Sequence, residues 1–170
     1  MAIAATDILY RYSGGSSNTV ADSCLGGVMS TSTEITTNVT HNAFDQVSGS
    51  ESLAGDTEYR GFYCLNNHVS LTAQNTVLYI SSNTSSTSTS LEMALAGEGL
   101  NATMETVANE NTAPVGETFT SQSTYATGLS MGNIPAGQRY GFWLKRIVNS
   151  SAPAMNDDTC TINIDCDTAA

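Results

Sequence analysis

The chain has 170 residues, of which 40% are hydrophobic and only 12% are charged. This length suits one domain with a sizeable core, and the apolar content excludes a disordered tail. The 16 acidic and 5 basic residues give a net charge of -11, which disfavours nucleic acid and membrane surfaces as partners because both are anionic.

The first residues, Met1–Asp7, lack the basic flank and the apolar length of a secretion signal. No stretch approaches the roughly 20 apolar residues of a membrane helix. We therefore expect a protein made in the cytoplasm and organised as a single domain. In this division, residues 1–12 form an N-terminal arm with the first strand, and residues 13–170 form the main domain.

The N-terminal third of the chain predicts two strand regions and a loop. Asp7–Tyr12 is a short first strand that ends at a Ser-Gly-Gly turn. A polar, Thr-rich strand region follows over Leu25–Val39. Gly49–Asp56 is predicted as a loop because small and polar residues dominate it.

The middle of the chain contains the longest apolar runs. Glu58–Leu65 and Leu71–Ile80 predict two strands, and the turn residues Asn66–His68 between them favour a hairpin. The polar segment Ser81–Ser90 is predicted as a loop. Leu91–Ala96 then alternates apolar and other residues in the manner of a strand.

The C-terminal part gives the clearest strand patterns. Residues 101–116 predict a long connection, and Glu117–Thr120 and Gly128–Met131 predict short strands. Gln138–Val148 and Cys160–Cys166 show the period of two that places side chains alternately on the two faces of a sheet. The whole pattern predicts an all-β fold, a single antiparallel β-sandwich of jelly-roll or immunoglobulin-like type with seven to nine strands and little helix.

The strand after the Pro-Ala-Gly turn is apolar on both faces. Tyr140, Phe142 and Leu144 share one face, and Trp143 and Ile147 share the other. One face of an antiparallel sandwich is usually wet. A second apolar face therefore indicates either a subunit interface or a roof formed by the chain's own long loops.

Four cysteines, Cys24, Cys64, Cys160 and Cys166, raise the question of metal binding or disulfides. No Cys-x-x-Cys pair is present, so we expect no metal site. Cys160 and Cys166 lie about 20 Å apart on one strand at about 3.3 Å per residue, and cannot pair with each other. Pairing with Cys24 and Cys64 stays possible, but buried free thiols are favoured for a cytoplasmic product.

The two histidines do not indicate catalysis. Asp45 follows His41 by four residues, but no Gly-x-Ser-x-Gly nucleophile motif accompanies them, and His41 and His68 are better explained as turn residues. Asp157–Asp158 and Asp165–Asp167 lack the ligand spacing of a calcium loop. We therefore expect no catalytic, cofactor-binding or metal-binding residues, no cofactor, and no enzyme activity.

Three of the five cations, Arg139, Lys145 and Arg146, lie within eight positions. They could orient the protein on an acidic partner, but pairing with the chain's own carboxylates is the favoured interpretation. The chain has a single tryptophan and 7% aromatic residues, so it offers few side chains that could stack on sugar rings.

Five ordered segments resemble a family of small virion proteins encoded among the head genes of tailed bacteriophages and prophages. These segments are Asp56–Arg60, Leu78–Thr84, Ala108–Pro114, Gly132–Gln138 and Trp143–Arg146. The resemblance extends over most of the chain, and its motifs are turns and strand starts without catalytic content.

The resemblance implies a capsid decoration, or cement, protein on the outer surface of the virion. Such a protein would bind the major capsid protein, bridge neighbouring capsid subunits, and associate with itself as a dimer or trimer. In this hypothesis Ala2–Tyr12 reaches onto the capsid. One alternative is a tail or head fibre component that recognises a receptor through Ser81–Ser90. The other is a β-sandwich glycan hydrolase or carbohydrate-binding module, which a glycan-binding screen and mutation of Trp143 would test.

Overall fold

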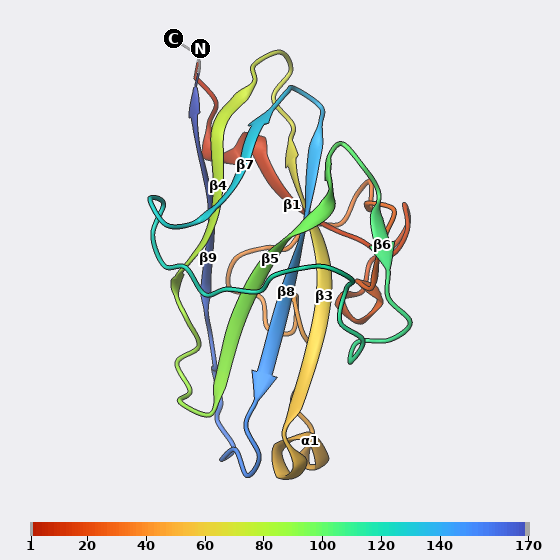
Figure 1. Cartoon of the computed structure of the whole chain (residues 1–170), viewed down its shortest axis with the longest axis vertical. Coiled ribbons are helices and arrows are strands. Elements are labelled where there is room, and N and C mark those ends of the chain that lie inside the picture. The colour runs from red at the N-terminus through yellow and green to blue at the C-terminus, as the bar shows by residue number, and fades with distance from the viewer. Residues whose placement is uncertain (1, 169–170) are drawn as a thin grey trace.

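The computed structural model describes residues 2–168 and shows a sandwich of two antiparallel sheets (Figure 1). These residues contain nine strands and one short α-helix, which confirms the all-β prediction. The four-stranded sheet has the order β1 (Ile8–Tyr12), β3 (Asp56–Asn66), β8 (Arg139–Val148) and β5 (Thr89–Leu100). The three-stranded sheet has the order β7 (Leu129–Ile134), β4 (Ala73–Ser82) and β9 (Thr161–Thr168), and β2 (Gly26–Gly27) pairs with β6 (Met104–Thr106).

The predicted hairpin between β3 and β4 is wrong, because these two strands lie in different sheets. The connection crosses from one layer to the other and is held by Asn66, whose Nδ2 donates to the carbonyl oxygens of Leu71 and Ile134. His68 stabilises the same connection, since its Nδ1 accepts hydrogen bonds from the backbone of Ser70 and Leu71. The side chain of a turn residue thus directs the chain into the second sheet.

The two apolar faces of β8 have different partners. Phe142 and Leu144 belong to the main core between the sheets. Trp143 points to the opposite side and forms a second cluster with Tyr63 and Met104, where its side chain is fully buried. That cluster is covered by the chain's own segments around β2 and β6. The second apolar face of β8 is therefore covered by other segments of the same chain.

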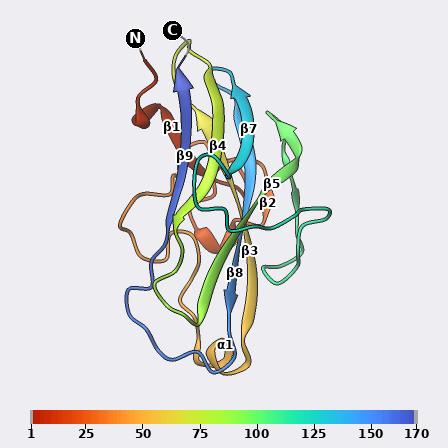
Figure 2. The same ribbon diagram turned by 60° about the vertical axis from the view of Figure 1, so that its left-hand side comes forward.

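Loops and the N-terminal segment cover the outer edges of several strands. The backbone of residues 33–35 pairs with β1 through Tyr12 and Ile35, and Thr120 pairs with Met93 of β5. At the N-terminus, Ile3 donates its backbone N–H to the hydroxyl of Thr168, and Figure 2 shows this segment beside β9. The segment Ala2–Tyr12 thus lies against its own sandwich.

Four local predictions differ from the structure. The predicted connection over residues 101–116 contains the short strand β6. Within Leu25–Val39, β2 is the only strand, and both of its glycines have positive φ angles, which interrupt an extended run. The predicted loop Gly49–Asp56 contains the helix α1 (Gly49–Ala54) instead. Ser48 and Glu51 begin this helix with a reciprocal capping box. Glu117–Thr120 contributes one isolated bridge and no strand. Among residues 2–168, no helix has the length and apolar character needed to cross a membrane.

Candidate functional site

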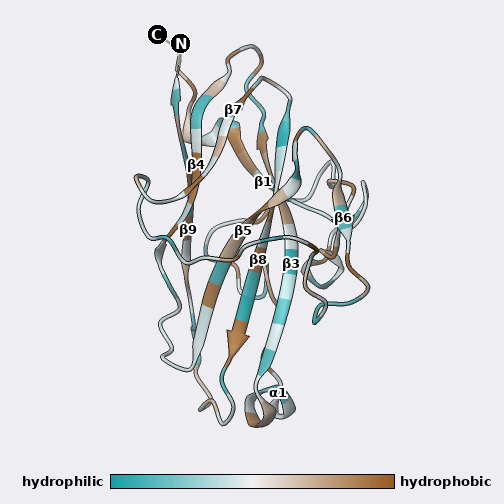
Figure 3. Ribbon diagram, viewed as in Figure 1, coloured by the Kyte–Doolittle hydropathy of each residue, from teal (hydrophilic) through white to brown (hydrophobic). Residues whose placement is uncertain are grey.

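A cluster of charged side chains occupies the lower half of the four-stranded sheet. Glu58 and Arg60 come from β3 and Arg146 comes from β8, while Asp45 and Glu110 come from two long loops. Figure 3 shows the corresponding hydrophilic stretches on the lower halves of β3 and β8. Both Glu58 and Arg60 have a fully buried residue surface, which is rare for charged residues.

Strand register explains why these charges meet. Glu58 lies directly opposite Arg146 in the antiparallel pairing of β3 with β8. Glu58 and Arg60 alternate with Tyr59, so they share the face that carries Phe62 farther along β3. The same face is therefore apolar in its upper half and ionic in its lower half.

The two guanidinium groups connect all three carboxylates. Arg146 forms ion pairs with Glu58 and, at 3.1 Å, with Asp45. Arg60 lies 2.5 Å from Glu110, 3.7 Å from Glu58 and 3.8 Å from Asp45. Each guanidinium therefore holds a loop residue and a strand residue at once.

Phe44 covers the cluster beside Asp45. The guanidinium carbon of Arg146 lies 4.9 Å from the centre of the Phe44 ring, and that of Arg60 lies 5.9 Å from it. Both distances are within cation–π range. The ring also packs against the main core, so the loop near residue 44 is held by apolar and charged contacts together.

The charges within the cluster do not balance. Three carboxylates face two guanidinium groups, and of the three carboxylates only Glu58 is shielded from water. Burial raises the pKa of Glu58 from 4.5 to about 7, against the opposing attraction of Arg146 and with a further increase from nearby Asp45. Glu58 therefore takes up a proton at a higher pH than an ordinary glutamate does.

Asp45, Glu58 and Glu110 are also the one set of described residues whose geometry would allow a metal ion. Their ligand oxygens lie within 4.8 Å of one another. Arg60 and Arg146 already bind these oxygens, and two fixed positive charges at that position repel a cation. The residues fit an ion-pair network and do not fit a metal centre.

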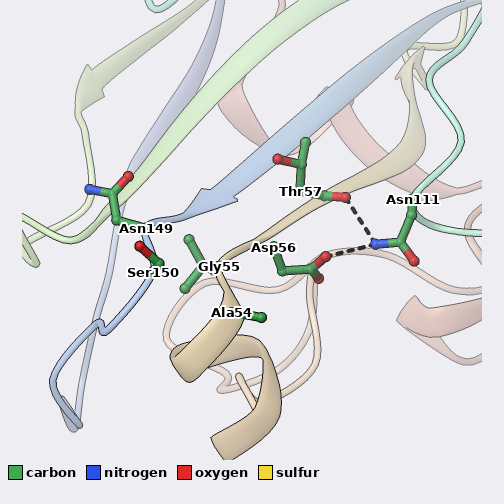
Figure 4. A pocket seen from close by; sticks show the side chains of 8 residues that line it. Ala54, Gly55, Asp56, Thr57, Asn111, Asn149 and Ser150 are labelled. Atoms are coloured by element: carbon green, nitrogen blue, oxygen red, sulfur yellow. Dashed lines mark hydrogen bonds between the residues drawn. The ribbon is translucent and has the colours of Figure 1, made fainter.

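A shallow, open depression of about 580 Å³ lies beside the cluster, at the end of the sandwich that carries α1 (Figure 4). Its lining includes Asp56, Thr57, Asn111, Asn149 and Ser150. Nδ2 of Asn111 donates to Asp56 at 2.9 Å and to the carbonyl oxygen of Thr57 at 3.0 Å. The lining residues offer hydroxyl and amide groups without a histidine or cysteine, which is typical of a polar contact surface.

The histidine–aspartate combination weighed from the sequence does not form a working pair. Asp45 is bound by the guanidinium groups of Arg60 and Arg146. His41 has a φ of 57° in a turn, and His68 accepts two backbone hydrogen bonds. Both histidines thus have positions expected of turn residues.

All four cysteines are free thiols. Cys24 and Cys64 are buried, Cys166 is half-buried and Cys160 is exposed. The free state matches the favoured interpretation from the sequence, but burial holds only for Cys24 and Cys64, because Cys160 lies just before β9 and is exposed. The structure contains none of the disulfides that the sequence left possible.

The acidic residues near the C-terminus have structural partners. Asp158 accepts hydrogen bonds from Ser85, from the backbone of Ser86 and from Thr89. Burial would raise the pKa of Asp158, but these hydrogen bonds outweigh it and lower the pKa. They fix the segment Ser81–Ser90 to the connection between β8 and β9. In the same region, Asp165 and Asp167 accept hydrogen bonds from Tyr79 and Asn75.

Two of the three neighbouring cations pair with carboxylates of the chain, as the sequence favoured. Lys145 pairs with Glu92 at 2.9 Å, and Arg146 belongs to the buried cluster. Arg139 forms no ion pair among the described residues and lies over the ring of Tyr63, 5.5 Å from its centre.

Sequence reasoning missed the cluster, although the sequence contains a signal for it. In β3, Glu58 and Arg60 occupy the alternate positions that continue as Phe62 and Cys64, so the period of two already places two charges on a core face. A charge on such a face needs a partner of opposite sign. The distant partners Asp45, Glu110 and Arg146 carry no local signal.

Three of the five ordered segments singled out in the sequence supply this cluster. Asp56–Arg60 provides Glu58 and Arg60, Ala108–Pro114 provides Glu110, and Trp143–Arg146 provides Arg146. Comparisons of the chain with models of known families, with curated proteins and with solved structures found no match. These comparisons therefore assign the chain to no family.

Proposed function

We propose that this chain is a structural protein of a tailed-phage virion, which decorates the outer capsid surface and stabilises the shell by bridging capsid subunits. The observation that supports this function best is the convergence of Asp56–Arg60, Ala108–Pro114 and Trp143–Arg146 on one buried ionic cluster. The segments on which the proposed resemblance rests would then have an architectural role, because they hold two long loops against the sandwich.

The distribution of charged groups supports a structural role, in which the protein binds other virion proteins and catalyses no reaction. Arg11, Arg60, Lys145 and Arg146 each form an ion pair with a carboxylate of the same chain. The surplus of acidic residues keeps the protein soluble at high copy number. On a shell with many copies, modest contacts with the major capsid protein and with neighbouring copies add up through multivalency.

The geometry does not favour the glycan-binding alternative. Trp143, the one tryptophan of the chain, has no exposed surface and cannot stack on a sugar ring. Among the described residues, Tyr125 is the one aromatic side chain that counts as exposed, with 40% of its surface accessible. The proposed receptor loop Ser81–Ser90 is tied back by Asp158, so it presents a fixed surface.

The test is to locate the protein on particles of the phage or induced prophage that encodes it. Particles are purified from the parent and from a deletion strain, analysed by mass spectrometry, and reconstructed by electron microscopy. We expect density of the size of this sandwich on the outer capsid in the parent and bare shells in the deletion. Adding the purified protein to the bare shells should restore the density and raise the temperature at which the shells open.

Three results would overturn the proposal. They are absence of the protein from purified particles, density on the tail or on a fibre, and deletion shells that open at the same temperature as the parent shells. Density on a fibre would support the receptor-binding alternative instead.

A further inference from the structure

Glu58 is enclosed by charged groups from every element that packs against its carboxylate. Arg60 comes from β3 itself and Arg146 from β8, while Asp45 and Glu110 come from the two long loops. The side chain of Glu58 is 1% exposed, whereas those of Asp45 and Glu110 are 40% and 37% exposed. Solvent reaches the two loop carboxylates and not the strand carboxylate.

The two oxygens of Glu58 have unequal surroundings. Oε2 accepts a hydrogen bond from Nε of Arg146, while Oε1 is buried and has no hydrogen-bond partner among the described residues. Across β8 from Glu58, the next strand contributes Leu91, an apolar neighbour of Arg146 in the sheet register. An ionised carboxylate needs donors for both oxygens, and one without them is costly to bury.

The same cluster holds both loops on the sandwich. The backbone N–H of Tyr59 donates to the carbonyl oxygen of Glu110, where the edge of β3 extends beyond its pairing with β1. Nη1 of Arg146 donates to the carbonyl oxygen of Asp45. A change in the charge of Glu58 therefore acts directly on the groups that dock residues 42–46 and 109–111.

We propose that this cluster is a proton-controlled lock, in which Glu58 holds a proton while the two loops are docked and releases it to solvent as they loosen at higher pH. With Glu58 neutral, two carboxylates balance two guanidinium groups. Ionisation adds a negative charge, while Oε1 accepts no hydrogen bond and has the Arg60 guanidinium only at 3.7 Å. The inference concerns the folded chain alone and does not depend on the proposed role in a virion.

The first test compares the wild type with Glu58→Gln in urea unfolding between pH 4 and pH 9. The folded form keeps a proton that the unfolded form loses above about pH 4.5, up to a folded pKa of about 7. Wild-type stability relative to the variant should therefore fall as the pH rises through this range. The equilibrium constant for folding of the wild type, divided by that of Glu58→Gln, should drop by up to about tenfold per pH unit and become constant above about pH 7.

Glu92→Gln is the matched control, because Glu92 also pairs with a cation on β8 but is 30% exposed. Its folding constant relative to the wild type should stay nearly flat between pH 5 and pH 7. A ratio for Glu58→Gln that is equally flat, or that rises with pH, would overturn the lock. It would show that Arg60 and Arg146 keep Glu58 ionised in the folded state.

Two measurements do not depend on how well the variant folds. In the native wild type, the side-chain carboxyl ¹³C shift of one glutamate should titrate near pH 7, and titration of every glutamate below pH 5 would refute the proposal. Hydrogen exchange at the Tyr59 amide, corrected for its intrinsic pH dependence, should lose protection between pH 6 and pH 8. The same amide should keep constant protection over that range if no lock exists.

Discussion

Replacing Arg60 with methionine is the most direct test of the buried ionic cluster. Arg60 is fully buried, and its guanidinium lies between Glu110, Glu58 and Asp45. Methionine keeps most of the side-chain volume but leaves three carboxylates with Arg146 alone. Removing one partner from a buried charge network costs about 3–5 kcal/mol, since the remaining charge is desolvated and unpaired.

Lys145→Met provides a control with the same loss of one positive charge on a neighbouring strand. Lys145 and Glu92 are partly exposed, at 22% and 30%, and neither belongs to a network with a fully buried charge. Ion pairs near the surface contribute about 0–1 kcal/mol. The two variants should therefore differ by about 3 kcal/mol, or roughly 10 °C in melting temperature for a domain of this size. The difference measures burial rather than net charge.

Urea unfolding at pH 7.5 can be followed by the fluorescence of Trp143, the one tryptophan, which is buried in the native state. Adding Glu58→Gln to Arg60→Met should recover part of the lost stability, because it removes the carboxylate that Arg60 leaves unpaired. Equal losses for Arg60→Met and Lys145→Met, or no recovery in the double variant, would refute the assignment of the cluster as a buried and interdependent network.

Two further predictions concern the β2 segment that covers Trp143 and the reactivity of the cysteine thiols. Gly26→Ala should lower the free energy of unfolding by about 1 kcal/mol, because alanine disfavours the left-handed backbone at this position. It should lower it by roughly 1–3 kcal/mol more, because a Cβ there overlaps the carbonyl of Glu105. Gly99→Ala, which has similar φ but open space around it, should cost the first amount alone, and equal melting temperatures for the two variants would contradict this. Burial raises the pKa of Cys24 and Cys64 to about 12, so a thiol reagent at pH 8 should label exposed Cys160 first and these two only after denaturation. Labelling of Cys64 as fast as that of Cys160 would show that the core opens readily.

The sequence was most informative where one strand could be interpreted by itself. The alternation in Gln138–Val148 assigned Phe142 and Leu144 to one face and Trp143 to the other, and the structure confirms both assignments. Such patterns depend only on the geometry of a single extended chain, in which neighbouring side chains point in opposite directions. One local signal was overlooked: the spacing of Ser48 and Glu51 predicts the start of a helix.

The tertiary structure alone decided which strands are neighbours and which charges meet. Glu58–Leu65 and Leu71–Ile80 read as a hairpin, yet β3 pairs with β1 and β8, and β4 pairs with β7 and β9. Backbone hydrogen bonds are alike in every antiparallel pair, so partner choice depends on burying two sheet faces together rather than on any single strand. The same packing brings Glu110 and Asp45 to Arg60 from far along the chain. A buried charge is tolerated only where the completed fold supplies its counterpart, and no local pattern in the sequence can specify that distant residue.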